Sequence, residues 1–194
     1  MKKVIKKIPI IGDLGRSIYR KLKGIKSFKT SEKYWEENYK KGGNSGEGSY
    51  NNLAEFKAEV INEFVNEKKV LSVIEFGCGD GNQLRYFQFK SYLGYDVSRT
   101  VIQKCSADYA NDKTKKFKII DSSGDTTSDL TLSLDVIYHL VEDDTFNLYM
   151  ERLFKASNKF VIIYSSNLEE TTRSVPHVRH RKFDEWVKVN ASNF

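Results

Sequence analysis

The residues with the clearest chemical meaning are three glycines that follow a short apolar run. The segment VLSVIEFGCGDGN passes from apolar residues through Glu75 to Gly77, Gly79 and Gly81 at alternate positions. Glycine tolerates positive φ and lets a ligand approach the backbone with no Cβ in the way, so a tight turn without a ligand is the weaker alternative. Asn82 replaces the third glycine of a dinucleotide-binding GxGxxG motif, and no Lys-Ser/Thr pair completes a P-loop. The turn instead suits a cofactor that presents an ammonium group to Glu75 or to the nearby backbone.

Acidic and hydroxyl side chains end the next two apolar runs. Asp96 ends SYLGYD, and an acid at the tip of a second strand can accept hydrogen bonds from both hydroxyls of a ribose. Because Asp96 also precedes a helical stretch, a solvated or helix-capping aspartate is the alternative. The third run ends at Asp121, followed by Ser122 and Ser123, in position to meet an adenine amino group, although an Asp-Ser-Ser-Gly turn explains the same residues. With the glycine turn, these residues favour a nucleoside site.

All three histidines lie in two segments that a fold could bring to one cleft. His139 stands in DVIYHLVED, and His177 and His180 stand in VPHVRHRKF with Arg179 and Arg181. Histidine can accept a proton from an alcohol near neutral pH, so all three are candidate catalytic residues; histidines that fix a loop are the alternative. The basic cluster suits an anionic acceptor, or else it is a solvated turn. Because the histidines show no ligand spacing on a common element, we expect no metal site.

These residues must be positioned by a sheet, and the chain has the pattern of one. We expect strands over 70–76, 91–97, 116–120, 129–136 and 158–166, and helices over 98–111 and 145–157. This alternation indicates βαβ units and a doubly wound, mostly parallel α/β sheet, in which ligands bind beyond the carboxyl ends of the strands. The last of these strands is apolar on both faces, which is typical of a central parallel strand.

Two further helices are expected before the first strand. Ser31 is expected to cap a helix that carries Tyr34, Trp35 and Tyr39 and that stops at Gly42-Gly43. A Gly/Ser/Asn loop follows it. The next segment predicts an amphipathic helix, with apolar residues at helical spacing: Leu53, Phe56, Val60, Ile61 and Phe64.

The basic charge of the chain is concentrated near its N-terminus. The net charge is +6, but residues 1–41 hold 13 Lys/Arg against four Asp/Glu, while the remainder hold 19 against 22. We therefore predict a basic arm over 1–30, either solvated or in peripheral contact with an anionic membrane surface or a partner, and a single domain over 31–194. The basic pI describes the arm and not the fold, so we expect no nucleic-acid partner.

Cysteine content and hydropathy bear on the compartment. Two cysteines without a CxxC spacing suit a reducing compartment, and the arm has no apolar run near 20 residues. We expect a cytoplasmic protein, with peripheral contact at the inner face of the membrane as the alternative that the basic arm leaves open.

The sequence resembles the class I S-adenosylmethionine (SAM)-dependent methyltransferases over about residues 50–166. The matching motifs are VIEFGCGDGN, YLGYDVS, IIDSS and LTLSLDVIYHLVED. A narrower resemblance, to small bacterial methyltransferases of surface-polysaccharide and other glycan gene clusters, is carried by EFGCGDGNQL, SLDVIYHLVED, FVIIYSS and HVRHRKFDEWV. The resemblance implies a Rossmann-like fold, SAM as cofactor, and O-methylation of a small or glycan-linked acceptor, including phosphate- or phosphoramidate-bearing ones.

The resemblance also implies roles for individual residues. From the methionine end of the cofactor through the sulfonium to the ribose and adenine, the implied binding residues are Glu75, Gly77, Gly79, Gly81, Leu134, Asp96, Asp121 and Ser122. Leu134 and Asp135 would form the floor beneath the sulfonium. Tyr34, with Trp35 and Tyr39, would cover the cofactor or else pack onto the domain. The candidate substrate-binding residues are Tyr164, Arg179 and Arg181.

The sequence departs from this family at its C-terminal end. The family sheet usually continues past the fifth strand with a helix and an antiparallel strand pair, whereas this sequence ends at Phe194. We expect the pair to be missing or short, because the sequence is a piece of a longer chain, because a partner completes the edge, or because substrate binding differs. An uncovered edge would favour a homo-oligomer.

Two other functions compete with catalysis on a small acceptor. The shortened C-terminus is the best support for a non-catalytic SAM-binding scaffold or regulator. A nucleic-acid methyltransferase is less favoured, because SLDVIYHL lacks the two prolines of the amino-methylating motif.

Overall fold

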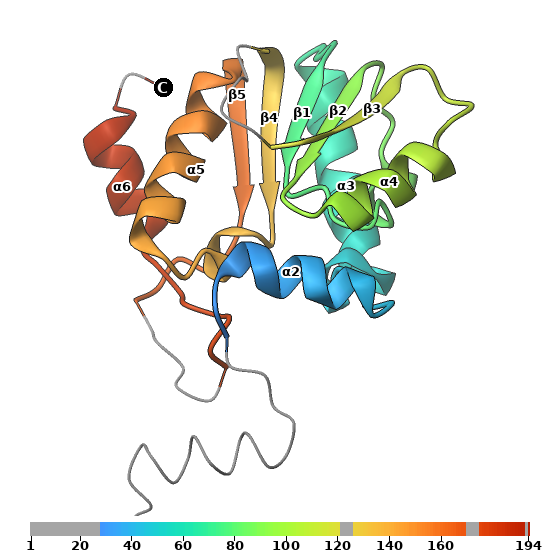
Figure 1. Ribbon diagram of the computed structural model, residues 1–194. Coiled ribbons are helices and arrows are strands. Elements are labelled where there is room, and N and C mark those ends of the chain that lie inside the picture. The colour runs from blue at the N-terminus through green and yellow to red at the C-terminus, as the bar shows by residue number, and fades with distance from the viewer. Residues whose placement is uncertain (1–27, 121–125, 170–174, 193) are drawn as a thin grey trace, which may run out of the picture.

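The computed structural model describes residues 28–120, 126–169, 175–192 and 194, so the expected arm over 1–30 lies almost entirely outside the described residues. At the centre is a five-stranded, all-parallel sheet with strand order β3-β2-β1-β4-β5 (Figure 1). The strands are β1 Val73–Phe76, β2 Tyr92–Asp96, β3 Lys115–Ile119, β4 Ser128–Leu134 and β5 Ser157–Tyr164. The predicted doubly wound α/β fold is confirmed, and each strand end lies within three residues of its expected position.

Helices cover both faces of the sheet because alternate residues of its central strands point in opposite directions. Val73 of β1 shares a core with residues of α3 (Asn51–Glu67) and α4 (Arg99–Asp108). Ile74, the next residue, belongs to a second core with α5 (Asp143–Lys155), against which α6 (Phe183–Asn190) also packs. Strand β1 is buried along its whole length, as the centre of a parallel sheet should be.

Helix α3 is amphipathic, but it does not bury the face that the sequence pattern suggests. Leu53, Phe56 and Val60 are each about half exposed. The buried residues are Ala54, Lys57, Ala58, Ile61 and Val65. The helix therefore approaches the sheet through small side chains, and it carries a lysine into the interior. Of the five apolar positions expected to define this helix, only Ile61 is fully buried, while Phe64 packs partly buried against the core.

Strand β5 lies at the edge of the sheet and not at its centre as its apolar composition suggests. Its residues are half-buried or exposed. Among the described residues after β5, helix α6 is present and no further sheet strand follows. Within that part of the chain, the expected absence of the C-terminal strand pair agrees with the structure.

Helix α2 (Ser31–Lys40) runs across the carboxyl ends of the strands, as Figure 1 shows. Its N-cap is Thr30, whose hydroxyl accepts a hydrogen bond from Lys33 N, and not Ser31 as expected. The Ser31 hydroxyl instead donates to Glu142 at 2.7 Å, which ties the start of α2 to the segment before α5. The connection from β1 to β2 is shorter than in most βαβ units, because it contains only the 3₁₀ turn η2 (Gln83–Tyr86). No helix among the described residues has the length and apolar character needed to cross a bilayer.

Candidate functional site

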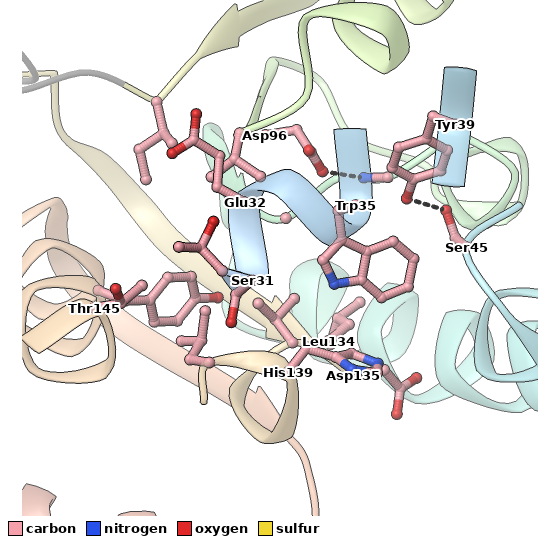
Figure 2. A pocket seen from close by; sticks show the side chains of 18 of the residues that line it. Ser31, Glu32, Trp35, Tyr39, Ser45, Asp96, Leu134, Asp135, His139 and Thr145 are labelled. Atoms are coloured by element: carbon pink, nitrogen blue, oxygen red, sulfur yellow. Dashed lines mark hydrogen bonds between the residues drawn. The ribbon is translucent and has the colours of Figure 1, made fainter. Parts of the chain in front are cut away.

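A cavity of about 280 Å³ lies at the carboxyl ends of β1, β2 and β4, with α2 over it (Figure 2). Its wall residues come from α2 and the loop after it, the glycine turn, the end of β2 and the segment between β4 and α5. The predicted site residues that line this cavity are Trp35, Tyr39, Gly77, Gly79, Asp96, Leu134, Asp135 and His139. The sheet therefore brings the expected glycine turn, acid and histidine to one place.

Glycine is required at positions 77 and 79 both by the backbone conformation and by close contacts with neighbouring side chains. Gly77 has φ of 81° and Gly79 has φ of 55°. A Cβ on Gly77 would lie 2.5 Å from the Val136 side chain, and one on Gly79 would lie 2.2 Å from Ser45 Oγ. The N–H groups of this turn are engaged within the chain, because Gly77 N and Cys78 N donate to the Tyr95 carbonyl oxygen and Gly79 N donates to Asp96. The two glycines therefore bring bare backbone to the cavity with no side chain in the way. Gly81 also has positive φ, but it faces a separate hollow on the other side of the turn.

Asp96 joins the turn to the end of β2. It is buried, and its carboxylate accepts hydrogen bonds from Gly79 N at 3.1 Å and from Ser98 N at 2.9 Å. The N-cap of α4 is Ser98, so Asp96 does not cap that helix. Burial raises the pKa of Asp96 to about 6, which leaves it mostly ionised at neutral pH. A carboxylate at the cavity wall has lone pairs left for the hydroxyl groups of a ligand.

Glu75 lies beneath the turn and does not line the cavity. Tyr92 donates a hydrogen bond to it at 2.5 Å, and burial raises the pKa of Glu75 to about 7. Glu75 is therefore buried in β1 and hydrogen-bonded to Tyr92 of β2, a placement that differs from the expected contact with an ammonium group of the cofactor.

The end of β4 carries an ion pair that the sequence analysis missed. Asp135 lines the cavity with a left-handed φ of 59°, and its carboxylate accepts hydrogen bonds from Lys57 Nζ at 2.6 Å and from the Tyr138 hydroxyl at 3.1 Å. Lys57 also lies over the Tyr164 ring, with Nζ 5.2 Å from the ring centroid. A charged residue amid the buried positions of a predicted helix was the only signal that could have pointed to Lys57.

His139 faces the cavity from the 3₁₀ turn η3 (Ile137–His139). Its Nδ1 lies 3.2 Å from the His177 carbonyl oxygen, which can only accept, so Nδ1 carries the hydrogen and Nε2 has a free lone pair. Burial lowers the pKa of His139 to about 4. The imidazole is therefore neutral at physiological pH and can accept a proton.

The other predicted histidines lie behind His139. The His177 ring stacks on Tyr34 with centroids 4.1 Å apart, and His180 Nδ1 lies 2.6 Å from Ser166 Oγ. Neither histidine lines the cavity, and Tyr34 does not line it either. The aromatic residues of α2 that reach the cavity are Trp35 and Tyr39.

The two arginines of the predicted basic cluster are bound within the chain. Arg181 is buried, donates to the carbonyl oxygens of Leu140 and Val141, and pairs with Asp143 at 2.6 Å. Arg179 pairs with the same carboxylate at 3.0 Å. Both guanidinium groups therefore fix the segment between β4 and α5, a placement that differs from the expected contact with an anionic acceptor. Tyr164 ends β5 beside Lys57 and lies outside the cavity wall.

The adenine end of the predicted site is only partly described. Asp121 and Ser122 lie outside the described residues, whereas Ile120 lines the cavity beside Asp96. No group of three or more His, Cys, Asp or Glu side chains within the described ranges is placed to hold a metal ion.

A set of polar contacts fastens α2 and the loop after it over the cavity. Glu36 accepts hydrogen bonds from the hydroxyls of Ser98 at 2.5 Å and of Thr100 at 3.0 Å. In the loop, Ser45 N donates to Asp80 of the glycine turn at 2.9 Å, and Tyr39 shares a hydrogen bond with Ser45 Oγ. Sequence reasoning did not find these contacts, because the partners of Glu36 and of Ser45 N lie 35 or more residues away in the chain.

Comparison with known proteins agrees with this geometry. The family model described as a methyltransferase domain matches residues 50–188. A comparison with curated proteins finds no match.

Several solved structures share the fold. N-methyltransferase NodS from Bradyrhizobium japonicum, in complex with S-adenosyl-L-homocysteine (SAH), is 14% identical with a TM-score of 0.63, covering 83% of this chain and 85% of its own. Magnesium protoporphyrin IX methyltransferase from Synechocystis with bound SAM is 14% identical with a TM-score of 0.60, covering 87% and 88%. The methyltransferase domain of a bacterial protein, CtHen1, is 21% identical with a TM-score of 0.54, covering 74% and 86%.

Proposed function

This chain belongs to the methyltransferase-domain family, and we propose that, as a SAM-dependent class I member, it binds SAM in this cavity and methylates a small or glycan-linked acceptor. When bound, SAM supplies a methyl group on a sulfonium, which is open to in-line attack by a nucleophile. The protein contributes alignment and, for a hydroxyl acceptor, a base that takes up the proton.

The observation that carries this proposal is the shared cavity. The glycine turn, Asp96 and His139 all line one cavity at the carboxyl ends of parallel strands. Ligands of open α/β sheets bind at this place. The residues present fit a nucleoside: Asp96 has lone pairs for ribose hydroxyls, and Gly77 and Gly79 have no side chain to keep the amino-acid end away from the backbone.

His139 is the base in this proposal. Its Nε2 is an acceptor because Nδ1 is held by the His177 carbonyl, and its low pKa keeps it unprotonated at neutral pH. The ring is fixed by an edge contact with Trp35, with centroids 4.8 Å apart. A base held in this way can take the proton of an acceptor hydroxyl as the methyl group is transferred.

We take O-methylation of a hydroxyl as the reaction, and glycan or polysaccharide biosynthesis as its setting, from the sequence resemblance and from His139. A neutral hydroxyl fits better than a phosphate- or phosphoramidate-bearing acceptor, because Arg179 and Arg181 are both paired with Asp143. Peripheral membrane contact through the arm, a homo-oligomer, the absence of a nucleic-acid partner and a cytoplasmic location stay predictions.

The test is a calorimetric titration with SAM followed by a methyl-transfer screen. We expect one SAM site per chain and transfer to a sugar hydroxyl. Matched amino-sugar and sugar-phosphate acceptors show which acceptor class is methylated. Duplex DNA and RNA are screened as well, to test the expectation that the protein has no nucleic-acid partner. SAM binding without transfer to any acceptor would favour the non-catalytic alternative, and no SAM binding would contradict the proposal.

A further inference from the structure

At the cavity wall, Asp135 forms a buried ion pair with Lys57, a residue to which neither the sequence resemblance nor the proposed methyl transfer assigns a role. The distance from Lys57 Nζ to Asp135 Oδ2 is 2.6 Å, and the side chains are 2% and 15% exposed, respectively. Asp135 lines the cavity. Lys57 extends from α3 to the Asp135 side chain and is not part of the cavity wall. Of the two partners, only Asp135 therefore belongs to the cavity wall.

This pair is costly to maintain. Removing two charges from water usually costs as much free energy as their attraction returns, so apolar residues of similar volume would be as stable. Asp135 also adopts a left-handed φ of 59°, which is strained for a residue with a Cβ. The loop after α2 closes tightly on the same carboxylate, since a Cβ on Gly48 would lie 2.5 Å from Asp135 Oδ2. A buried ion pair, a strained backbone conformation and a closely packed glycine thus coincide at one residue of the cavity wall.

The other hydrogen-bonded carboxylates of the wall are stabilised differently. Asp96 accepts hydrogen bonds from the backbone N–H groups of Gly79 and Ser98. Glu142 accepts them from the backbone and hydroxyl of Ser31. Among the described residues that line the cavity, only Asp135 is a carboxylate paired with a lysine, and none is itself Lys or Arg.

We propose that the Lys57–Asp135 pair makes the cavity sensitive to the charge of the cofactor and so distinguishes SAM from its product. This inference rests on the proposed function. The sulfonium of SAM carries a positive charge that is absent from the thioether of SAH once the methyl group has left. Asp135 stabilises the charged form, and Lys57 opposes that effect from the far side, so the preference for SAM is present but limited. A limited preference favours substrate binding without making either ligand bind too tightly to exchange.

The experiment compares the dissociation constants of SAM and SAH, measured by calorimetry on the full chain. Asp135→Asn removes the negative charge, and we expect the preference for SAM over SAH to fall roughly tenfold, the effect of a partly screened unit charge at a few ångströms. Lys57→Met leaves the carboxylate uncompensated, and we expect the preference to rise by a similar factor. A pair with a structural role alone would affect both ligands alike in each variant and leave the ratio unchanged.

Two control variants keep the test decisive. Tyr138→Phe removes a hydrogen bond from the same carboxylate without changing its charge, so the SAM-to-SAH ratio should stay at the wild-type value. If Lys57→Met does not fold, the double variant Lys57→Met/Asp135→Asn takes its place, and its ratio should lie between those of wild type and Asp135→Asn, because Lys57 no longer opposes the sulfonium. Equal ratios in wild type and Asp135→Asn, or shifts in the same direction for both single variants, would overturn the inference. Failure of the wild type to bind either ligand would instead contradict the proposed function.

Discussion

The floor and the cover of the cavity are built by opposite means. The floor consists of the central strands, where Ile74 and Leu132 are at most 1% exposed and belong to the two apolar cores. The cover is α2, whose only buried residue is Ser31. It is held by hydrogen bonds to Glu142, Ser98 and Thr100 and by ring contacts of its half-buried aromatic residues with two histidines. Apolar burial contributes several kcal/mol per large side chain on truncation, whereas a typical hydrogen bond contributes about 1 kcal/mol net. The cover should therefore open at far lower free-energy cost than the floor unfolds, which would let a ligand enter.

The largest effect on stability is expected from a substitution in the central strands that form the floor. Leu132→Ala creates a cavity at a fully buried position of β4, and we expect it to lower the free energy of unfolding by about 3 kcal/mol. Trp35→Ala, in the cover, should lower it by about 1 kcal/mol or less. Urea denaturation of both variants measures this difference. Equal losses of stability would show that the cover is part of the cooperative core.

The next largest effect is expected on turnover. His139→Ala removes the proposed base, so turnover of a hydroxyl acceptor from the screen should fall about a hundredfold while SAH affinity changes little. In the wild type, kcat/KM should decline as the pH falls through about 4, because the imidazole then becomes protonated. Unchanged turnover in the variant would make His139 a residue that fixes the loop and nothing more.

Asp96 tests whether the ligand lies against the floor. Asp96→Ala removes the carboxylate assigned to the ribose, and we expect SAM binding to weaken more than tenfold, roughly 1.4 kcal/mol. Calorimetry gives the dissociation constant, and circular dichroism shows whether the variant is folded. An unchanged dissociation constant in a folded variant would contradict the assignment.

The smallest effect concerns the fastening of the cover. Hydrogen bonding from Ser98 lowers the pKa of Glu36 to about 2. A carboxyl group whose pKa is lower in the folded than in the unfolded state stabilises the fold above its unfolded value and loses that contribution as the pH falls through its folded value. The cover should therefore loosen between about pH 4.5 and pH 2, seen as a change in Trp35 fluorescence. Glu36→Gln should flatten this transition and cost about 1 kcal/mol or less at neutral pH. A transition of the same size in the variant would exclude Glu36 as its cause.

The floor could be predicted from sequence and the cover only in part. The apolar runs around Ile74 and Leu132 and the glycines at 77 and 79 are local signals, and the strands and turn formed where those signals placed them. Helix α2 was expected from its own residues, but the way in which Glu36 and Ser31 fasten it depends on partners more than 60 residues away.

The sequence pattern misjudged which face of α3 is buried and where β5 lies in the sheet. The spacing of Leu53, Phe56 and Val60 indicates a helix, but it does not say which stripe faces the sheet, and here small residues and Lys57 do. The apolar composition of β5 suggested a central strand, but β5 lies at the edge of the sheet with its residues half-buried or exposed. Composition does not report how many neighbouring strands a strand pairs with. Lys57 was missed because an isolated lysine in a helix is normally exposed.

All the residue roles assigned above require a nucleoside cofactor to bind between the glycine turn and α2. The most direct measurement is a crystal structure of the full chain in complex with SAH. We expect SAH in the cavity, with its ribose hydroxyls hydrogen-bonded to Asp96 and its amino-acid end against Gly77 and Gly79. Trp35 of α2 should cover the bound SAH. SAH bound elsewhere on the protein, with this cavity filled by side chains, would contradict it.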